Sequence, residues 1–572
     1  MRKVCRTGRR NTSPTAVEAF VAQAGKLPRV AANSRKNPCF ATRQQKNRSA
    51  AARTVTDIHR IQEAVMLLGH PVLFKSLCYV DGRWVHSASA ASVAVHNPAD
   101  QQVLGHVPML DAAQITEAVG AAQRAFSTWR WLPVSQRSAL LLRWHELILR
   151  HQHDLAAILS LEQGKPLAEA RGEIAYGASF VEWFAHEVRR LNGRTIPTHI
   201  DGAHLGTMIE PVGVAALITP WNFPCAMITR KAAAALAAGC TVVVKPAHET
   251  PFSALALAQL AEEAGFPAGV FNVVLGEPQM AMERLVGDSR VRSVSFTGST
   301  RVGALVMQAA ARAGIKKTAL ELGGNAPFIV TGDADLDQAV RVAVAAKFQT
   351  SGQDCCAANR IFVARPLYEA FVAQYSDAVK ALKVGAAFEA NVDVGPLMHQ
   401  AAFDSTAQRV ADAKARGARI TAGGGAHERG GWFFEPTVVA DAAPGMRIYD
   451  EENFAPISAV SPFDSLDEVV ERANDTEYGL AAYVCARDLN TVFQLIRRLD
   501  FAMVSVNGAK FTGAPIPFGG IKSSGLGREG GAEGFEPFVE TRYFCLGQLG
   551  LPVTESLPAH RLAAATGAAA TA

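Results

Sequence analysis

The chain has 572 residues, enough for two or three domains around a large core, and its 49% hydrophobic content is typical of a globular protein. Its longest apolar runs, such as 232–244, are too short to span a bilayer, which argues against a membrane protein. Residues 1–65 hold 14 Lys and Arg against three acids and so carry a charge of +11. Because the whole chain carries +5, the remainder carries −6, an ordinary acidic balance with no basic face for nucleic acid.

The two ends of the chain are predicted to be disordered. Residues 1–65 are rich in Arg, Ala, Ser and Asn and lack sustained amphipathic periodicity, and 551–572 end in AAATGAAATA. Three explanations of the basic segment stay open: an organellar transit peptide, which would make the protein mitochondrial, a basic binding arm, or upstream sequence joined to a chain that starts at Met66.

Strands and then helices are predicted for the region that follows. Short β-rich pieces bounded by Asp-Gly, Asn-Pro and Gly signals lie at 79–85, 93–98 and 103–108. Apolar residues at three- to four-residue spacing predict amphipathic helices at 112–126, 135–164 and 168–191. An Asp-Gly turn within alternating sequence predicts a hairpin at 195–210.

Two α/β regions fill most of the remainder. At 212–322, strands such as VGVAALI, TVVVKP and VRSVSF alternate with helices, which predicts a doubly wound parallel sheet with ligands at the carboxyl ends of its strands. From 326 to about 513 a second α/β pattern contains the strands FIV, IFVA, ISAVSPF and VSVN. The predicted fold class is therefore α/β with two sheet domains.

Three polar stretches hold the candidate catalytic residues. KFQTSGQDCCAANR at 347–360 places two cysteines after a glycine, where backbone amides or a helix N-terminus can favour a thiolate, so Cys355 is the predicted nucleophile and Cys356 a packing residue. Glu321, in LELGGN, has apolar neighbours that could desolvate it and raise its pKa, as suits a base for water. Asn222, in ITPWNFP, is an amide between two prolines that could hold an oxyanion.

The cysteine pattern indicates neither disulfides nor a metal. The nine cysteines are odd in number, scattered and mostly within apolar segments, which indicates a reducing compartment and favours the cytoplasm. Cys and His residues do not cluster at metal-ligand spacing, so no metal is expected.

Taken together, seven motifs resemble the aldehyde dehydrogenase superfamily, in the family's order and nearest to its succinate-semialdehyde dehydrogenase branch: ITPWNFP, VVVKPAHETP, SFTGSTRVG, LELGGN, GQDC, EENFAP and PFGGIKSSGLGREGG. The resemblance spans roughly residues 72–549, and the stretch that opens at Met66 resembles the usual start of the family. It implies a doubly wound, parallel-sheet cofactor domain, a second α/β catalytic domain and a small β flap that joins subunits into a homodimer or homotetramer. The implied boundaries are 66–192 and 212–322 for NAD(P) binding, 323–530 for catalysis, and 193–211 with 531–550 for the oligomerisation strands.

The resemblance also implies the cofactor, NAD or NADP, and the residues that bind it. Thr297, Gly298 and Ser299 form a strand-to-helix turn that suits a phosphate. Many NAD-preferring relatives carry a glutamate where this chain has His248, so the choice between NAD and NADP stays open. Ala455 replaces a usual glycine in EENFAP. The remaining cofactor residues implied are Thr219, Pro220, Trp221, Lys245, Glu452 and Phe454.

Oxidation of an aldehyde to the carboxylic acid through a cysteine thioester is the implied reaction. Succinate-semialdehyde enzymes hold the distal carboxylate with two arginines, a task that suits the guanidinium group. Arg230 matches one of them, the neutral Gln349 stands in place of the other, and Thr512 in place of an assisting serine. A short semialdehyde such as succinate semialdehyde is the expected substrate. The alternatives are an uncharged aliphatic or aromatic aldehyde, acyl transfer to coenzyme A, and a non-catalytic scaffold.

Overall fold

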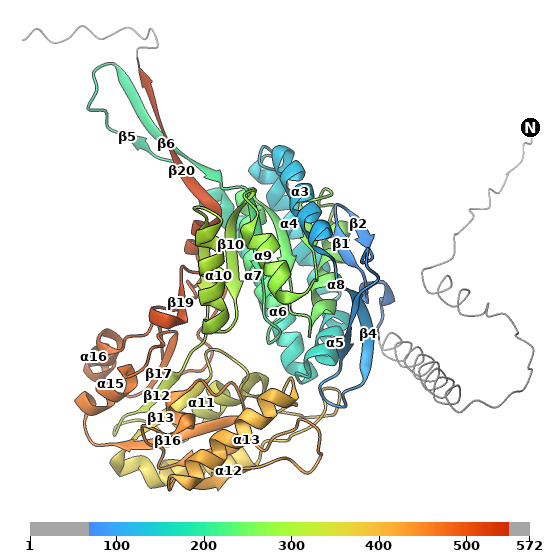
Figure 1. The fold of residues 1–572 in the computed structure, drawn as a ribbon. Helices are drawn as coiled ribbons and strands as arrows, with labels where there is room; N and C mark the ends of the chain where they lie inside the picture. Colours follow the sequence, from blue (N-terminus) through green and yellow to red (C-terminus); the bar gives the residue numbers. More distant parts are fainter. Residues whose placement is uncertain (1–67, 548–572) are drawn as a thin grey trace, which may run out of the picture. The chain divides into compact units, whose positions relative to one another are not determined.

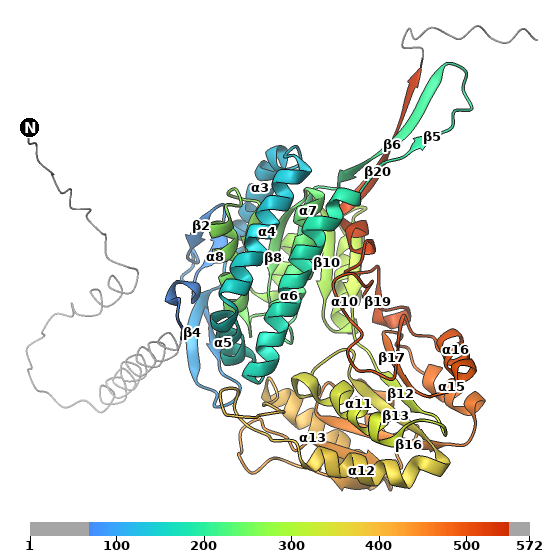
Figure 2. The same ribbon diagram turned by 180° about the vertical axis from the view of Figure 1, so that it is seen from behind.

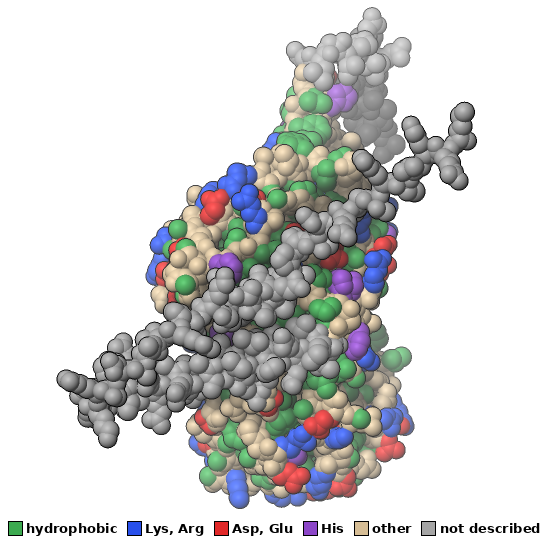
Figure 3. All heavy atoms as spheres, turned by 90° about the vertical axis from the view of Figure 1, so that its right-hand side faces the viewer, with side chains coloured by type: hydrophobic (Ala, Val, Ile, Leu, Met, Phe, Trp, Pro, Cys, Tyr) green, Lys and Arg blue, Asp and Glu red, His purple; other side chains and the backbone are tan. Residues whose placement is uncertain are grey.

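The structure, a computed structural model, describes residues 68–547. The predictions for 1–65 and 551–572 concern residues outside this range. None of the described helices is both long and apolar enough to cross a membrane. On the face shown in Figure 3, basic and acidic side chains of the described residues lie interspersed.

The first of two large sheets has eight strands in the order β19-β11-β10-β7-β8-β9-β1-β2. The five from β11 to β9 run parallel, as the alternating sequence predicts, and the outer strands pair antiparallel. Helices cover both faces, with α9 and α10 in front in Figure 1 and α4 and α6 in front in Figure 2. The strands are β1 (Cys78–Val80), β2 (Arg83–Val85), β7 (Val214–Ile218), β8 (Thr241–Lys245), β9 (Phe271–Val273), β10 (Val291–Thr297), β11 (Lys317–Glu321) and β19 (Gly525–Leu526).

The helices of this region include the one clear departure from the predicted elements. The apolar periodicity over 135–164 predicts one helix, but the chain bends at His151, which has φ −102° and ψ 21°, into two. Residues 154–163 of the second helix are all buried, so apolar residues continue without a break past the bend. The apolar pattern therefore gives no sign of the bend. The helices are α3 (Ala112–Trp129), α4 (Val134–Arg150), α5 (Gln152–Gln163), α6 (Leu167–Glu187), α7 (Ala226–Ala238), α8 (Pro251–Ala264), α9 (Pro278–Gly287) and α10 (Thr300–Arg312).

The second sheet has seven strands in the order β14-β15-β16-β13-β12-β17-β18, all parallel except the edge strand β14. Its strands are continuous apolar runs because α11 and α12 pack on one face and α13, α15 and α16 on the other. The strands are β12 (Ala326–Val330), β13 (Ala358–Ala364), β14 (Arg419–Ala422), β15 (Thr437–Ala440), β16 (Ile457–Phe463), β17 (Ala481–Cys485) and β18 (Met503–Val506). The helices are α11 (Leu336–Phe348), α12 (Tyr368–Lys380), α13 (Gln400–Ala415), α14 (Arg447–Asp450), α15 (Leu466–Asn474) and α16 (Leu489–Arg498).

Two smaller sheets complete the fold. The predicted hairpin is present, since β5 (Thr195–Ile196) pairs antiparallel with β6 (Ala203–Pro211), and β20 (Val539–Gly547) pairs along the other side of β6. This three-stranded flap exposes Met208, Tyr543 and Leu546. The strands β3 (Ser92–His96) and β4 (Val103–Pro108) form a separate antiparallel pair. The role of the flap in oligomerisation and the domain boundaries stay predictions.

Candidate active site

Cys355 lies in a loop that joins α11 to β13. A 3-10 turn, η3 (Gln349–Gly352), precedes it, and Thr350 and Ser351 there have φ of +51° and +57°, uncommon for residues other than glycine. The Oδ1 atom of Asp354 accepts the backbone N–H of Cys356 at 2.9 Å. The Asp354 carboxylate and the two sulfur atoms lie within 4.8 Å of one another, so an acid and a second thiol adjoin the candidate nucleophile.

These neighbours correct one expectation about Cys355. The hydrogen bond with the Cys356 thiol, burial, and the nearby Asp354 and Glu452 raise the pKa of Cys355 well above its usual value. The loop is not a helix N-terminus, so of the two sources of positive field that the sequence suggested only nearby backbone amides remain. Cys356 packs in the core of the second sheet, in agreement with its predicted packing role.

The side chain of Asn222 is held against this loop. Its Nδ2 donates to the carbonyl oxygen of Gln353 at 3.0 Å, two residues before Cys355. Lys165 Nζ donates to the Asn222 carbonyl at 3.0 Å and to Glu173 Oε2 at 2.6 Å. Buried contacts therefore fix both the backbone and the amide of Asn222 beside the cysteine loop, and the second N–H of the amide can serve an oxyanion.

Glu321 ends β11 and is 2% exposed. Among the described residues neither of its carboxylate oxygens has a hydrogen-bond partner. Burial and the negative charge of Glu529 raise its pKa well above the usual value, although Arg230 and Lys231 act in the opposite direction. A buried carboxylate with unused acceptors and a raised pKa has the properties of a general base.

Glu529 forms a buried ion-pair network that the sequence analysis missed. Its Oε2 lies 2.7 Å from Arg230 Nε, and its Oε1 accepts from Lys231 Nζ. Burial acts to raise the pKa of Glu529, but the two cations outweigh it and hold that pKa below its usual value. The Arg230 guanidinium also lies 4.2 Å from the Phe518 ring centre. Arg230, the predicted substrate residue, is thus paired inside the protein and close enough to Cys355 and Glu321 for their charges to affect its pKa.

The two glycines of LELGGN, Gly323 and Gly324, allow this turn to approach the loops that carry Cys355 and Glu452 closely. A Cβ on Gly324 would lie 2.3 Å from the carbonyl oxygen of Cys355, and one on Gly323 would lie 2.6 Å from Glu452 Oε2. The backbone N–H of Gly324 donates to Glu452 Oε1 at 2.9 Å. Side chains at either position would separate the cysteine loop, Glu321 and Glu452, so this motif joins the candidate catalytic and cofactor residues.

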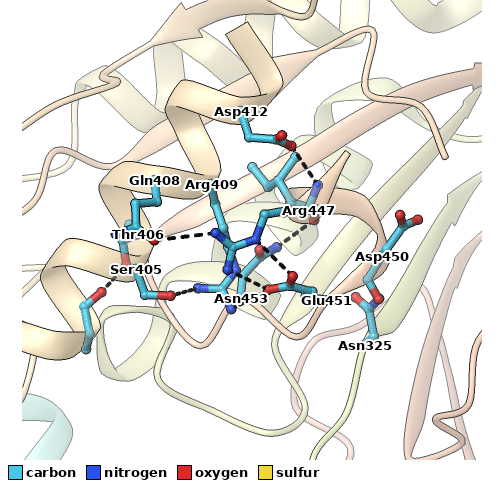
Figure 4. Close-up of polar contacts among 12 residues, drawn as sticks. Asn325, Ser405, Thr406, Gln408, Arg409, Asp412, Arg447, Asp450, Glu451 and Asn453 are labelled. Atoms are coloured by element: carbon cyan, nitrogen blue, oxygen red, sulfur yellow. Dashed lines mark hydrogen bonds and ion pairs between the residues drawn. The ribbon is translucent and has the colours of Figure 1, made fainter. Parts of the chain in front are cut away.

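The loop that carries Glu452 is held from outside by two arginines (Figure 4). Arg409 of α13 donates to Glu451 Oε2 at 3.0 Å, and Arg447 of α14 donates to Glu451 Oε1 at 2.9 Å. Burial raises the pKa of Glu452 to about 7, with the Gly324 amide and Lys347 acting against it. The clamp on Glu451 therefore fixes the backbone next to a buried acid.

Phe454 lies in the same loop, two residues after Glu452. It adopts φ +46°, and its ring stands perpendicular to that of Trp221 at 5.6 Å between centres. The structure thus brings together two cofactor residues predicted from separate motifs.

The other predicted cofactor residues lie at the carboxyl ends of neighbouring strands. Thr219 follows β7 and Thr297 ends the adjacent β10; both hydroxyls are buried and lack a partner among the described residues. Ser299 caps α10 and accepts from Val302 N at 3.4 Å, and the Gly298 N–H donates to the Glu321 carbonyl at 3.0 Å. The first-turn amides of Thr300 and Arg301 are left for a phosphate. The buried hydroxyls of Thr219 and Thr297, close to a helix N-terminus, fit the pyrophosphate and ribose of a dinucleotide.

Lys245 and His248 border this edge of the sheet. Lys245 ends β8, burial lowers its pKa, and its Nζ reaches only the Pro246 carbonyl at 3.3 Å among the described residues. His248 Nε2 lies 3.5 Å from Glu249 Oε1. A cation and an imidazole therefore flank the place predicted for the adenosine ribose, and Pro220 lies between Thr219 and Trp221 on the connecting loop.

Of the predicted substrate residues, Gln349 and Thr512 are exposed and Arg230 is buried. Tyr176 of α6 connects two of them: burial raises its pKa, and Arg230 and Thr512 beside it act against that rise. The sequence offered no signal for Tyr176 beyond helical periodicity, which makes any aromatic residue look like core.

Comparison with known proteins shows the family of this chain. The aldehyde dehydrogenase family matches residues 84–544. A non-phosphorylating aspartate-semialdehyde dehydrogenase of Halomonas elongata is 55% identical over 478 residues, 84% of this chain and 97% of the relative. The NADP(+) succinate-semialdehyde dehydrogenase of Escherichia coli is 48% identical over 482 residues, 84% of this chain and all of the relative. The solved succinate-semialdehyde dehydrogenase from Burkholderia pseudomallei has a TM-score of 0.83 at 47% identity, covering 84% and 99% of the two chains.

The chain therefore belongs to the aldehyde dehydrogenase family. It is an oxidoreductase that oxidises an aldehyde with NAD or NADP as cofactor.

Proposed function

We propose that this enzyme oxidises a short semialdehyde to the corresponding acid, with Cys355 as nucleophile, Asn222 as oxyanion donor and Glu321 as base. The observation that carries the proposal is the convergence of two loops. Asn222 is held two residues from Cys355, and Gly324, three residues after Glu321 in the LELGGN turn, closely approaches the Cys355 carbonyl. Neither carboxylate oxygen of Glu321 has a hydrogen-bond partner among the described residues. A scaffold protein would have no use for a buried carboxylate without partners, which costs stability.

The chemistry follows from these three groups. Cys355 loses its proton to solvent, and its sulfur attacks the carbonyl carbon to give a thiohemiacetal whose oxyanion receives hydrogen bonds from Asn222 Nδ2 and the Cys355 N–H. Bound NAD(P)+ supplies the acceptor for the hydride that leaves this carbon. Glu321 then takes a proton from water, the hydroxide attacks the thioester, and the carboxylic acid leaves as the sulfur is released.

A buried cation supports an acidic substrate. Relatives of this chain are named for aspartate semialdehyde, succinate semialdehyde, glutarate semialdehyde and 3-sulfolactaldehyde, all of which carry an anionic group away from the aldehyde. Arg230 is paired with Glu529 but is a cation close enough to Cys355 for the two charges to interact, and it could attract such an anion, with Thr512 and Gln349 nearer the surface. Glu321, in its intact LELGGN setting, favours water over coenzyme A as acyl acceptor.

The test is a steady-state assay at 340 nm with NAD and with NADP. Succinate semialdehyde and butanal share a four-carbon aldehyde and differ in the terminal carboxylate. We expect a higher kcat/KM for succinate semialdehyde, and no turnover by Cys355→Ala. Better oxidation of butanal would overturn the acidic substrate, and an active Cys355→Ala variant would overturn the nucleophile.

The cofactor and assembly assignments extend the same proposal. The first sheet binds the cofactor and the second carries catalysis, within the boundaries given above. His248 lacks the charge that repels a 2′-phosphate, so we propose that NADP is accepted; a His248→Glu variant should lose NADP turnover and keep NAD turnover.

The flap, with its exposed apolar residues, joins subunits into a homodimer or homotetramer in the cytoplasm, and light scattering can measure the mass of this assembly.

A further inference from the structure

Two histidines and a glutamate that the mechanism leaves unused meet near the C-terminal end of α8. His70 precedes the 3-10 turn η1 (Pro71–Leu73), His151 lies at the bend between α4 and α5, and Glu263 lies in the last turn of α8. One ring nitrogen of each histidine and one carboxylate oxygen of the glutamate all lie within 4.8 Å of one another. The two imidazole rings are nearly parallel, with their centres 4.7 Å apart. Sequence spacing predicts no metal here, because the three residues are far apart along the chain.

The backbone that carries the two histidines is fixed by hydrogen bonds. The Gly69 N–H donates to Asp154 Oδ1 at 2.9 Å, which ties the residue before His70 to α5. His151 makes backbone hydrogen bonds of 3.0 Å to both α4 and α5, so it ends one helix and begins the next. The two rings are therefore presented by segments that are already held together.

The three side chains are ligands of the kind that zinc takes in proteins. Imidazole nitrogens and carboxylate oxygens bind Zn²⁺ at about 2.0–2.2 Å, and two imidazoles on one tetrahedral zinc have ring centres roughly 5 Å apart, close to the separation observed. Burial and the neighbouring His70 lower the pKa of His151, although Glu263 and Asp154 act against this, and a lowered pKa favours the neutral ring that a metal requires. Gln259, one turn earlier on α8, donates to Glu263 Oε1 at 3.0 Å and so orients the carboxylate.

We propose that His70, His151 and Glu263 bind one Zn²⁺ ion, which links the segment before β1 to the α4–α5 bend and to the end of α8. The site goes beyond the proposed function and does not depend on it. Glu263 is exposed, so its side chain can rotate to bring an oxygen to bonding distance. Lys75 is near enough to interact with the charge of Glu263, but its Nζ lies over the Trp84 ring, 4.9 Å from the ring centre. The role of the ion is structural, because it joins three segments that are distant in the sequence.

Calorimetric titration of the metal-free, full-length protein with zinc chloride tests the site. The wild type should bind one Zn²⁺ per chain more than each of His70→Ala, His151→Ala and Glu263→Gln, with a Kd in the micromolar range. Excess Mg²⁺, which prefers oxygen ligands, should not compete. At a free zinc concentration about 100 times Kd, the Tm of the wild type should rise by about 2–3 °C more than that of the variants.

The controls separate this site from other zinc ligands and from misfolding. His153→Ala removes an exposed histidine two residues after His151 and should bind zinc as the wild type does. Glu263→Gln changes an exposed side chain, so its result holds even if a histidine variant fails to fold. Zinc held by Cys355 and Cys356 instead would be bound equally by the wild type and all three variants, which would overturn the inference. A Kd above about 1 mM, or an equal loss of zinc in His153→Ala, would overturn it as well.

Discussion

Glu321 and Glu529 are buried carboxylates in the same part of the structure, and their surroundings are opposite. Glu529 is paired with both Arg230 and Lys231, and the pKa of this carboxyl stays below its usual value despite burial. Glu321 has no hydrogen-bond partner among the described residues, and burial together with Glu529 raises its pKa. Burial alone therefore does not decide the state of an acid; the number of cations and donors that face it does.

The contrast separates stability from catalysis. A buried acid with two cations is held in one geometry and ionised, which suits a structural role. A buried acid without partners destabilises the fold, and its free lone pairs are available to a water molecule. The two are linked, because Arg230, Lys231 and Glu529 together set the potential at Glu321.

The largest effect is expected for Glu321→Gln. Without its base the thioester should hydrolyse roughly 10²- to 10⁴-fold more slowly, whereas formation of the thioester by Cys355 should persist. Rapid mixing should then show a burst of reduced cofactor near one per active site, followed by a slow steady state. Cys355→Ala supplies the matched control with no burst. Loss of the burst in Glu321→Gln as well would mean that Glu321 acts before the thioester forms.

The same substitution should raise thermal stability. The pKa of Glu321 is higher in the folded state than in the unfolded chain, so the wild type loses stability as pH rises from the unfolded pKa to the folded pKa. A neutral glutamine removes this loss, and the gain in Tm should be present at pH 7.5 and disappear near pH 4. A lower Tm at pH 7.5 would contradict the unpaired environment of Glu321.

Glu529→Gln should have the opposite effect on stability. It leaves two buried cations without a counter-charge, which typically costs about 3–5 kcal/mol. Urea unfolding should report this loss at pH 7. Glu117→Gln breaks an exposed pair with Arg124 and should cost less than about 1 kcal/mol. Equal effects of the two substitutions would remove the distinction between Glu529 and a surface acid.

The pH profile of thioester hydrolysis should shift in opposite directions when the acid Glu529 or the cation Lys231 of the ion-pair network is neutralised. Glu529 raises the pKa of Glu321, so Glu529→Gln should shift the acid limb to lower pH. Lys231 lowers that pKa, so Lys231→Gln should shift the limb to higher pH. Single-turnover decay of the thioester between pH 5 and 9 measures both. Limbs that move together would show that the base is not Glu321.

Sequence motifs indicated candidate reactive groups but not their environments. Strand-end residues such as Thr297 and Lys245 followed from alternation, since parallel strands bring their carboxyl ends together. The Lys231–Glu529 pair joins residues 298 positions apart, and neither stretch shows which partner the other meets. The raised pKa of Cys355 likewise depends on Asp354 and Glu452 meeting it in space, and the bend at His151 has no glycine or proline to mark it.

Glu451 supplies an intermediate case and the smallest expected effect. Hydrogen bonds from Arg447, and the charge of Arg409, hold its pKa below the usual value, but it is partly exposed, so water weakens both pairs. Arg409→Gln should raise KM for NAD(P) at most about 5-fold, as the loss of up to about 1 kcal/mol implies, because the loop that carries Glu452 loses one of its two clamps. Arg447→Gln should act more weakly, since its side chain is 39% exposed against 13% for Arg409. If both variants instead lower kcat with KM unchanged, the clamp acts on the cysteine loop through Gly324 and not on cofactor binding.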